Sequence, residues 1–467
     1  MLGSSAVAGL GTLLAGAPAE ALLAGVIVLV ALGFRVSPND AVRAGLLVGV
    51  GFVGVYLVVG LAVQRIAPAA ARLAETTPAA PTAVDVGWPV AATVGFGVVE
   101  IGFWIVPLFA ALNVLLYRVG FTFTLDVDVW NYWHFAFIAG LVFVTTGNWP
   151  YAVAVGLTLG LFSLVVADWF QPAIEESFEL DDVSIPHAFT GVMAVLAIPV
   201  DLLVRRTPLG NVEADPTTVQ ERLGVLGQPV FLGVVVGLGV GLAAYRDALA
   251  ATESWYAILE LAVVFAALMY ILPEVAGILI EGMDPLSEAV REWLTDRGEE
   301  EVAVGLDAAV LVGDEAVAAA GILMVPIALA MMLVLPGNEL LWGVDLATFP
   351  FFVAMMVPLT DGDLVRLVVA GTVVLVPTHF VATWLAPRIV ETATHAGAPP
   401  IEGGSYTVAL AGSPANGVLA LPAPVGLIAG LAAVLAMRAA LALWPHRMYT
   451  LAGASDEKAA EFVDRRH

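Results

Sequence analysis

The chain has 467 residues, of which 60% are hydrophobic and only 13% charged, and its mean hydropathy is +0.93. Soluble globular domains carry about 25% charged residues, so this composition excludes a soluble protein and indicates an all-α polytopic membrane protein. The formal net charge of −24 argues against nucleic acid as a partner.

The acidic residues gather in short clusters, such as residues 175–182 and 284–301, and Lys458 is the single lysine of the chain. These clusters could form a vestibule that attracts cations, but a solvated surface adapted to high salt is the simpler interpretation, and we infer a halophilic microbial source. The chain has no cysteine, which excludes disulfides, thiolate metal sites and a phosphocysteine. No Lys or Arg precedes Arg35, so the apolar N-terminal region is expected to remain as a span rather than act as a signal peptide.

Roughly ten or eleven stretches are apolar and long enough to span a membrane. In the first half we expect spans at residues 20–34, 44–63, 104–117, 135–146 and 150–168, and one that opens at SIPHAF (184–189) and ends near 203. A polar, proline-rich loop is expected at 65–85. In the second half we expect spans near 227–244, 255–281, 321–335, 346–359, 364–386 and 418–444, and an acidic helix at 285–297.

The chain therefore divides into two halves, residues 1–204 and 227–444, joined by a linker at 205–226 and followed by a tail at 445–467. Arginines in the linker and the tail place both on the cytoplasmic side under the positive-inside rule. Residues 85–102 are apolar but contain four glycines, a proline and Glu100, which favours a broken or re-entrant helical segment inside the protein. A second such hairpin is expected near 304–320, and the stretch 396–416 resembles another re-entrant loop.

Similar sequences recur in the two halves. VGWPVAATVG (86–95) returns as VGLDAAVLVG (304–313) with five identities in ten positions, and Pro107, Asp128 and ADWFQPAI (167–174) recur as Pro326, Asp345 and ATWLAPRI (382–389) at similar offsets. A tandem repeat of this length is typical of transporters, in which the substrate site lies at the interface between the repeats.

Ionisable side chains inside a membrane cost about 2.5 to 3.5 kcal/mol each, so they indicate function. The candidates near apolar segments are Asp85, Glu100, His134, His187, Asp307, Asp314, Glu315 and His379. His134 and His187 could pair with sugar hydroxyls, and a neutral imidazole can accept a proton from a hydroxyl that attacks phosphorus. The alternative is that each histidine only bonds the backbone where a helix starts.

Asp307 stands where Pro89 stands in the first half, and a carboxylate there suits two vicinal hydroxyls, although it could also be a helix cap. Asp314 and Glu315 would suit a cation or proton site, or could simply face water. The six histidines show no metal-ligand spacing, and the chain has neither a P-loop nor a GxSxG motif, so we expect no metal and no cofactor. The energy for transport must then come from an ion gradient or from a partner protein.

Several long motifs resemble the galactitol-type IIC permeases of the bacterial phosphotransferase system, over about residues 36–390. They include VSPNDAVRAGLLVGVGFVG, VDVGWP, DVWNYWHFAF, SIPHAF, GLDAAVLVG and DLATFPFF. The resemblance implies a multi-pass, homodimeric carrier in the cytoplasmic membrane, surrounded by lipid, with two inverted repeats that each contain a re-entrant hairpin. It also implies a core domain that holds the substrate and slides past a scaffold domain.

The resemblance further implies that a separate IIB protein, itself supplied by IIA, phosphorylates a polyol or sugar bound to the permease. The pocket would be lined by Gly87 and Trp88 of VGWP together with His134, His187 and Asp307, and His187 would position or deprotonate the attacking hydroxyl. The competing interpretation is a secondary transporter without phosphotransferase partners, in which Asp314 or Glu315 couples an ion. A receptor or structural role fits poorly with two glycine-broken segments at corresponding positions.

Overall fold

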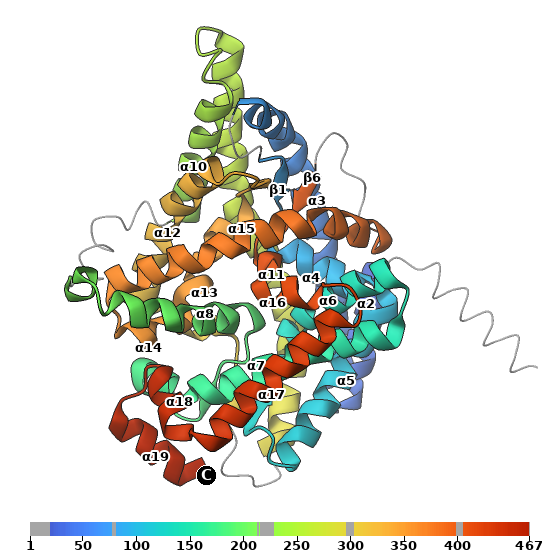
Figure 1. Ribbon diagram of the computed structural model, residues 1–467. Coiled ribbons are helices and arrows are strands. Elements are labelled where there is room, and N and C mark those ends of the chain that lie inside the picture. The colour runs from blue at the N-terminus through green and yellow to red at the C-terminus, as the bar shows by residue number, and fades with distance from the viewer. Residues whose placement is uncertain are drawn as a thin grey trace, which may run out of the picture.

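A computed structural model describes residues 19–76, 81–212, 214, 228–295, 303–397 and 405–466. In this part of the chain the protein consists mainly of helices, which surround two small parallel sheets (Figure 1). The helical fold class predicted from composition is confirmed, and the two sheets are an addition that the composition did not predict. Most of the linker predicted at 205–226 lies outside the described residues.

The first half starts with a short and a long helix and then alternates strands with helices. In chain order, with η denoting a short 3-10 turn, its elements are α2 (Ala19–Gly33), α3 (Pro38–Thr76), β1 (Ala83–Asp85), α4 (Trp88–Gly97), α5 (Val99–Arg118), β2 (Thr124–Asp126), η1 (Val129–Tyr132), α6 (Trp133–Thr146), α7 (Trp149–Phe178), β3 (Val183–Ser184), α8 (Ala188–Val204) and η2 (Pro208–Asn211).

The second half follows a similar order and adds three helices at its end. Its elements are α10 (Pro229–Ala244), α11 (Thr252–Thr295), β4 (Ala303–Gly305), η3 (Ala308–Leu311), α12 (Glu315–Val334), β5 (Leu340–Leu341), η4 (Val344–Thr348), α13 (Phe349–Val353), η5 (Ala354–Met356), α14 (Val357–Thr360), α15 (Leu364–His395), β6 (Ser405–Thr407), η6 (Leu410–Gly412), α16 (Pro414–Leu419), α17 (Val425–Leu443), α18 (Pro445–Leu451) and α19 (Asp456–Arg466). The inverted orientation of the two halves stays a prediction.

Two helices are longer than the sequence patterns predicted. Helix α3 continues to Thr76, into the region predicted as a loop, because the alanine-rich stretch after Pro68 consists of strong helix formers. Helix α11 joins the predicted span 255–281 and the acidic helix 285–297 into one helix that ends at Thr295. It packs closely on α3 at Gly282, where a Cβ atom would lie 2.8 Å from the carbonyl oxygen of Ala44.

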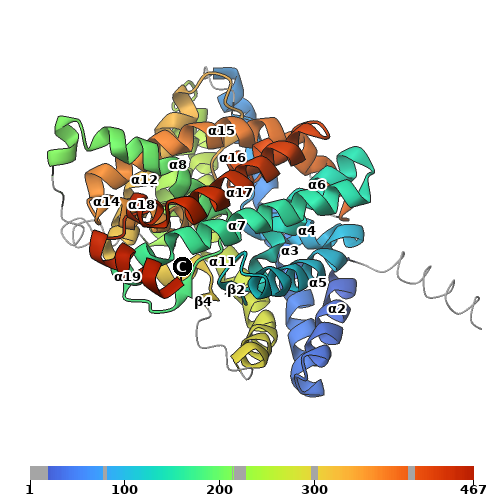
Figure 2. The ribbon, with the colours of Figure 1, turned by 60° about the horizontal axis from the view of Figure 1, so that its bottom comes forward.

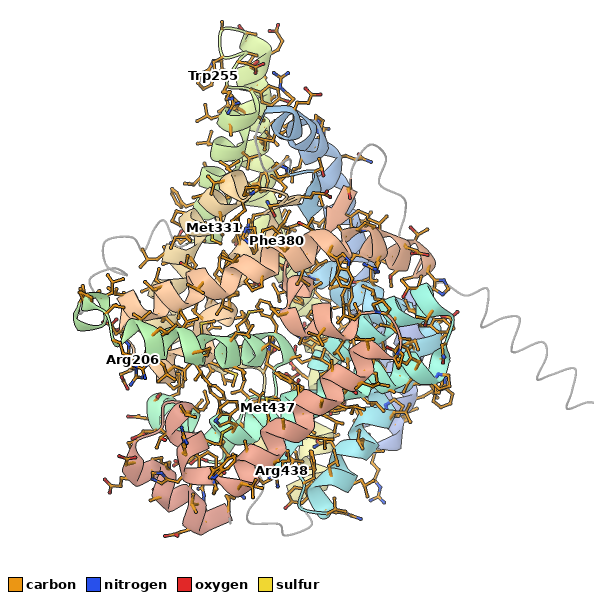
Figure 3. All side chains as sticks on the ribbon, viewed as in Figure 1. Arg206, Trp255, Met331, Phe380, Met437 and Arg438 are labelled. Atoms are coloured by element: carbon orange, nitrogen blue, oxygen red, sulfur yellow. The ribbon has the colours of Figure 1, made fainter. Side chains whose placement is uncertain are left out.

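Helices α2, α3, α10 and α11 pack on one another and form a four-helix group. The end of this group projects beyond the rest of the molecule, with Trp255 near its tip (Figures 1 and 3). Gly233, Gly237 and Gly241 lie four residues apart on α10, and a Cβ atom at any of them would run into α11. Small residues at this spacing let two helices approach closely, which is a common way for helices to associate in membranes.

Each small sheet takes strands from both halves of the chain. Sheet A has the order β5-β1-β6 and sheet B the order β2-β4-β3, and all neighbouring strands are parallel. In both sheets the central strand comes from one half and the two outer strands from the other. Figure 2 shows β2 and β4 side by side between the surrounding helices. Buried backbone groups need hydrogen-bond partners, and these pairings supply them where the helices are interrupted.

Strand β1 leads into the segment that the sequence predicts to be broken. Helix α4 ends at Gly97 and α5 begins at Val99, because Val98 has non-helical backbone angles (φ −74°, ψ 82°). The interruption of the helix is therefore observed, and its re-entrant path stays a prediction. In the second half, η3 and α12 occupy the corresponding place after β4.

Five helices in the described part of the chain are long and apolar enough to cross a membrane: α5, α7, α12, α15 and α17. Three further apolar segments are shorter, at 188–204, 233–244 and 349–360. Within the span window of α17 only 17% of residues are buried inside the protein, so most of this apolar helix is left to face lipid or another molecule.

The C-terminal helices pack against the underside of sheet B. The buried carboxylate of Glu175, near the end of α7, binds Arg465 at 2.8 Å and Lys458 at 3.2 Å, both from α19. Arg438 of α17 donates from Nε to the carbonyl oxygen of Phe121, just before β2, at 2.6 Å (Figure 3). These contacts connect the end of the chain to the strands that carry the candidate site.

A buried ion pair connects α8 to α15. Asp201 accepts two hydrogen bonds from Arg366, at 2.9 and 3.0 Å, and the Arg366 guanidinium also donates to the Leu359 and Thr360 carbonyl oxygens. We expect Asp201→Ala to lower the free energy of unfolding by about 3 to 5 kcal/mol, because the mutation removes the buried carboxylate that pairs with Arg366 and leaves it only the exposed Asp361.

The measurement is thermal unfolding of the purified protein in detergent. Glu281→Ala is the matched control, because Glu281 pairs with Arg43 at a site where both side chains are more than half exposed and such pairs contribute less than about 1 kcal/mol. Equal losses of stability in the two variants would contradict the structural role assigned to the buried pair.

Candidate substrate-binding site

Three strands of sheet B end at the same edge, and each leads into a turn that carries a polar side chain. Strands β2 and β3 both end opposite Gly305, the last residue of the central strand β4. Asp128 therefore lies two residues after the end of β2, and Asp307 lies two residues after the end of β4. His187 lies three residues after the end of β3. Parallel strands end at a common edge, so this pairing brings together residues that are far apart in the sequence.

His187 precedes α8 and caps it. Its Nδ1 accepts the backbone N–H of Thr190 at 3.2 Å and lies 3.0 Å from the Thr190 hydroxyl. Because a backbone N–H can only donate, Nδ1 carries no proton. Burial lowers the pKa of His187, which favours the neutral ring with its proton on Nε2. His187 therefore presents an N–H donor from Nε2, while its other nitrogen holds the start of the helix.

His134, near the start of α6, lies against His187. The two ring centroids are 4.9 Å apart in an edge-to-face arrangement, and the His134 ring also stacks on Trp133 with centroids 3.6 Å apart. Only 6% of His134 is exposed, yet its Nε2 has no hydrogen-bond partner among the described residues. Buried polar atoms are nearly always paired, so an unpaired imidazole nitrogen at this position points to a ligand.

Contacts within the fold use only part of the hydrogen-bonding capacity of Asp128 and Asp307, the two acidic side chains that follow β2 and β4. Asp307 accepts the backbone N–H of Ala309 at 2.9 Å, and Asp128 accepts the backbone N–H and the side-chain amide of Asn131. A carboxylate has about four lone-pair sites, so both groups keep free acceptor capacity. Burial, followed by the nearby charge of Asp307, raises the pKa of Asp128 to about 8. At neutral pH Asp128 therefore holds a proton, which adds an O–H donor to the edge.

Gly87 and Trp88 reach this region from sheet A. The φ of Gly87 is +79°, and a Cβ atom there would lie 2.5 Å from a methyl group of Val344, so only glycine fits. The backbone N–H of Trp88 donates to Asp345 at 2.8 Å, and its ring meets that of Trp130 edge-on, with centroids 6.2 Å apart. Because Trp130 follows Asp128 within the same turn, Trp88 contributes to the aromatic wall beside the polar cluster.

The other sequence candidates lie outside this cluster. Asp314 caps α12 and accepts two backbone N–H groups of its first turn, at 2.9 and 3.1 Å, while Glu315 is exposed. His379 accepts the Trp342 indole N–H at 3.0 Å, and Glu100 pairs with an exposed histidine. Asp314 thus caps a helix, a role that the sequence suggests only for Asp307, and Asp307 itself caps η3. An ion-coupling role for Asp314 and Glu315 stays an untested prediction.

Two features of the site were not assigned a role from the sequence. The repeat aligns Asp128 with Asp345, but the sequence alone does not identify Asp128 as a site residue. Asp85 was considered singly, although its carboxylate contacts Asp345. The repeat contained the signal, because two aspartates at matching positions of two strand ends indicate a shared local arrangement.

The cluster combines donors and acceptors of hydrogen bonds without a cation. No group of three or more histidine and acidic side chains in the described residues could hold a metal ion. The Nε2–H of His187 and the protonated carboxyl group of Asp128 can donate, while the remaining carboxyl oxygens can accept. This arrangement suits a ligand with several adjacent hydroxyl groups, each of which donates and accepts one hydrogen bond.

Comparison with known proteins gives a consistent result. The family model described as "PTS system sugar-specific permease component" matches residues 14–402. The galactitol-specific EIIC component of Escherichia coli strain K12 is 32% identical over 383 residues, which cover 82% of this chain and 83% of that protein. A putative permease IIC component of the same strain is 33% identical over 375 residues, 80% of this chain and 84% of that protein. The chain belongs to the sugar-specific permease components of the phosphotransferase system.

Proposed function

We propose that the protein is the IIC permease of a phosphotransferase system and carries galactitol or a closely related polyol. The similarity to a galactitol-specific component supports this substrate class. The observation that carries the proposal is the unpaired Nε2 of His134 beside His187 and the incompletely used carboxylates at the edge of sheet B. In this proposal Asp307 and Asp128 bind two vicinal hydroxyls, and the two histidines bind others.

The phosphoryl group would come from a partner, because this chain has no cysteine that could carry it. In the proposed step a hydroxyl oxygen of the bound polyol attacks phosphorus on a phosphocysteine of IIB. The P–S bond breaks, the thiolate leaves, and the hydroxyl proton passes to a basic group or to water. Since Nδ1 of His187 already accepts the Thr190 N–H, its hydrogen bonding favours a positioning role, with Nε2–H holding the attacking hydroxyl, over a role as the base.

We further propose that the protein works in the cytoplasmic membrane as a multi-pass homodimer by an elevator movement. The four-helix group α2, α3, α10 and α11 would be the scaffold, and the part that contains both sheets would be the moving core. Two observations support this division. The scaffold helices contact one another extensively, and large apolar side chains of α3 and α11, including Leu46, Leu57 and Val263, are exposed.

The test of the proposed function is uptake of radiolabelled galactitol into vesicles that contain the protein, with and without IIA, IIB and phosphoenolpyruvate. We expect phosphorylated galactitol inside the vesicles only when all partners are present. Accumulation of free galactitol driven by an ion gradient alone would overturn the proposal in favour of a secondary transporter.

Substitution of Asp307 separates a binding residue from a helix cap. We expect Asp307→Asn to weaken galactitol binding about tenfold or more, because a charge-assisted hydrogen bond to a hydroxyl becomes a neutral one. Asp314→Asn is the matched control, since asparagine caps helices as well as aspartate does and Asp314 is outside the cluster. Isothermal titration with galactitol measures both variants, and similar affinities in the two would remove Asp307 from the site.

Substitution of His134 separates ligand binding from stability. We expect His134→Phe to unfold at the same or a higher temperature than the parent protein, because it removes a buried, unpaired nitrogen and keeps the ring stack with Trp133. Galactitol affinity should fall about tenfold. Unchanged affinity would show that His134 only packs beside the site.

Substitution of His187 tests its role in the transfer step. We expect His187→Gln to reduce the rate of coupled phosphorylation by more than it reduces galactitol affinity, because a misplaced hydroxyl attacks phosphorus less often. The measurement compares phosphorylation rates at saturating galactitol with affinities from titration. If both binding and coupled phosphorylation persisted in this variant, His187 would have neither role.

A further inference from the structure

Sheet A also carries a pair of buried aspartates, one at the end of its central strand and one in the turn after an outer strand. Asp85 ends β1 and is 0% exposed, and Asp345 lies in the first turn of η4 and is 1% exposed. Their side chains lie within hydrogen-bonding range of each other. The proposed transport mechanism uses neither group directly, so their chemistry calls for a separate explanation.

The carboxylate of Asp85 is saturated by backbone donors. One oxygen accepts the N–H groups of Gly87 (3.1 Å) and Ala409 (2.9 Å), and the other accepts those of Gly343 (3.2 Å) and Asp345 (2.8 Å). These four bonds come from turns that follow all three strands of sheet A. A carboxyl group that accepts four N–H groups strongly favours its ionised form, because that form only accepts hydrogen bonds.

Asp345 has fewer donors. Each of its oxygens accepts one backbone N–H, from Trp88 at 2.8 Å and from Leu410 at 2.8 Å. About half of the lone-pair sites of the Asp345 carboxyl group therefore have no backbone donor. This is the side chain that touches Asp85. A proton on Asp345 would make an O–H donor to Asp85, whereas two ionised carboxylates in contact would repel each other in a buried site.

No positive charge is available to neutralise a dianion here. In the described residues, no ion pair involves Asp85 or Asp345. The nearby His379 is neutral, because its Nε2 accepts the indole N–H of Trp342 and its Nδ1 lies 3.0 Å from the Leu375 carbonyl oxygen, to which it must donate. Tyr406 of β6 pairs with Val84, the residue before Asp85, and a tyrosine is uncharged in its ordinary form.

We propose that Asp85 and Asp345 form a carboxylate and carboxylic acid pair that shares one proton, held by Asp345, and that this pair positions Trp88 at the substrate site. The pair fixes the backbone N–H groups of Gly87 and Trp88, and through them the ring of Trp88 against Trp130. Asp85 and Asp345 are positioning residues, because they act on the pocket through the backbone that carries Trp88. The part of this inference that concerns substrate rests on the proposed polyol function, and the part that concerns the proton does not.

The test compares three asparagine variants of the full-length protein. Asparagine donates from its NH₂ group where a protonated aspartate donates from O–H, but that NH₂ group accepts no hydrogen bond. The substitution therefore costs Asp345 one of its two backbone N–H contacts and costs Asp85 two of its four. We expect Asp345→Asn to fold and to bind galactitol within about fivefold of the parent protein, because it loses one backbone hydrogen bond. Asp85→Asn should lose about tenfold or more in affinity, or fail to fold, and the double variant should behave like Asp85→Asn.

Infrared difference spectra provide a readout that a purely structural role would not change. The parent protein should show the C=O stretch of a protonated carboxyl group that is absent from Asp345→Asn, while the bands of other carboxyl groups cancel in the difference. Equal damage in the two single variants, tolerance of Asp85→Asn alone, or an unchanged carboxyl band in Asp345→Asn would overturn the inference.

The same measurements distinguish this inference from the proposed function. If the parent protein bound no galactitol but the carboxyl band disappeared in Asp345→Asn and that variant unfolded like the parent, the polyol proposal would fail and the shared proton would stand. If galactitol bound to the parent and to both single variants equally, the pair would not position the pocket.

Discussion

The structure depends on backbone hydrogen bonds between short parallel strands that come from different halves of the chain. Helices that stop inside an apolar protein leave N–H and C=O groups without partners, and water is not there to satisfy them. Six short strands interrupt the helices at corresponding places in the two halves, and these strands pair in two sheets of three. This pairing holds the halves together and fixes where the turns after each strand must lie.

The two sheets use one local arrangement for two purposes. In each, an aspartate at the start of a 3-10 turn lies near a second aspartate that follows the central strand or ends it. In sheet A, six backbone N–H groups consume most of the acceptor capacity of the pair. In sheet B, Asp128 and Asp307 receive only local bonds from their own turns. The first pair is therefore a structural clamp, and the second keeps the free lone pairs that a ligand with hydroxyl groups requires.

The remainder of the molecule supports this centre from two sides. Close packing at the glycines of α10 joins it to α11 and so completes the four-helix group. On the other side, α19 neutralises the buried Glu175 at the end of α7, next to the strands of sheet B. Burying a carboxylate is costly unless it is paired, so the chain's single lysine and Arg465 have a structural use in an otherwise acidic protein.

The sequence by itself determined the membrane class and the approximate positions of most helices, and it identified His134, His187 and Asp307 as candidates. Composition, apolar run length and rare polar residues are local properties of the chain. It also revealed the interruption after VGWP, since glycine and proline act within a few residues. It did not predict the extent of α3 and α11, which pack on each other along their length. The two sheets and both acidic pairs were decided by the tertiary structure alone. Two-residue and three-residue strands have no recognisable period, and a carboxylate becomes a clamp or a ligand site only through the number of N–H groups that distant segments bring to it.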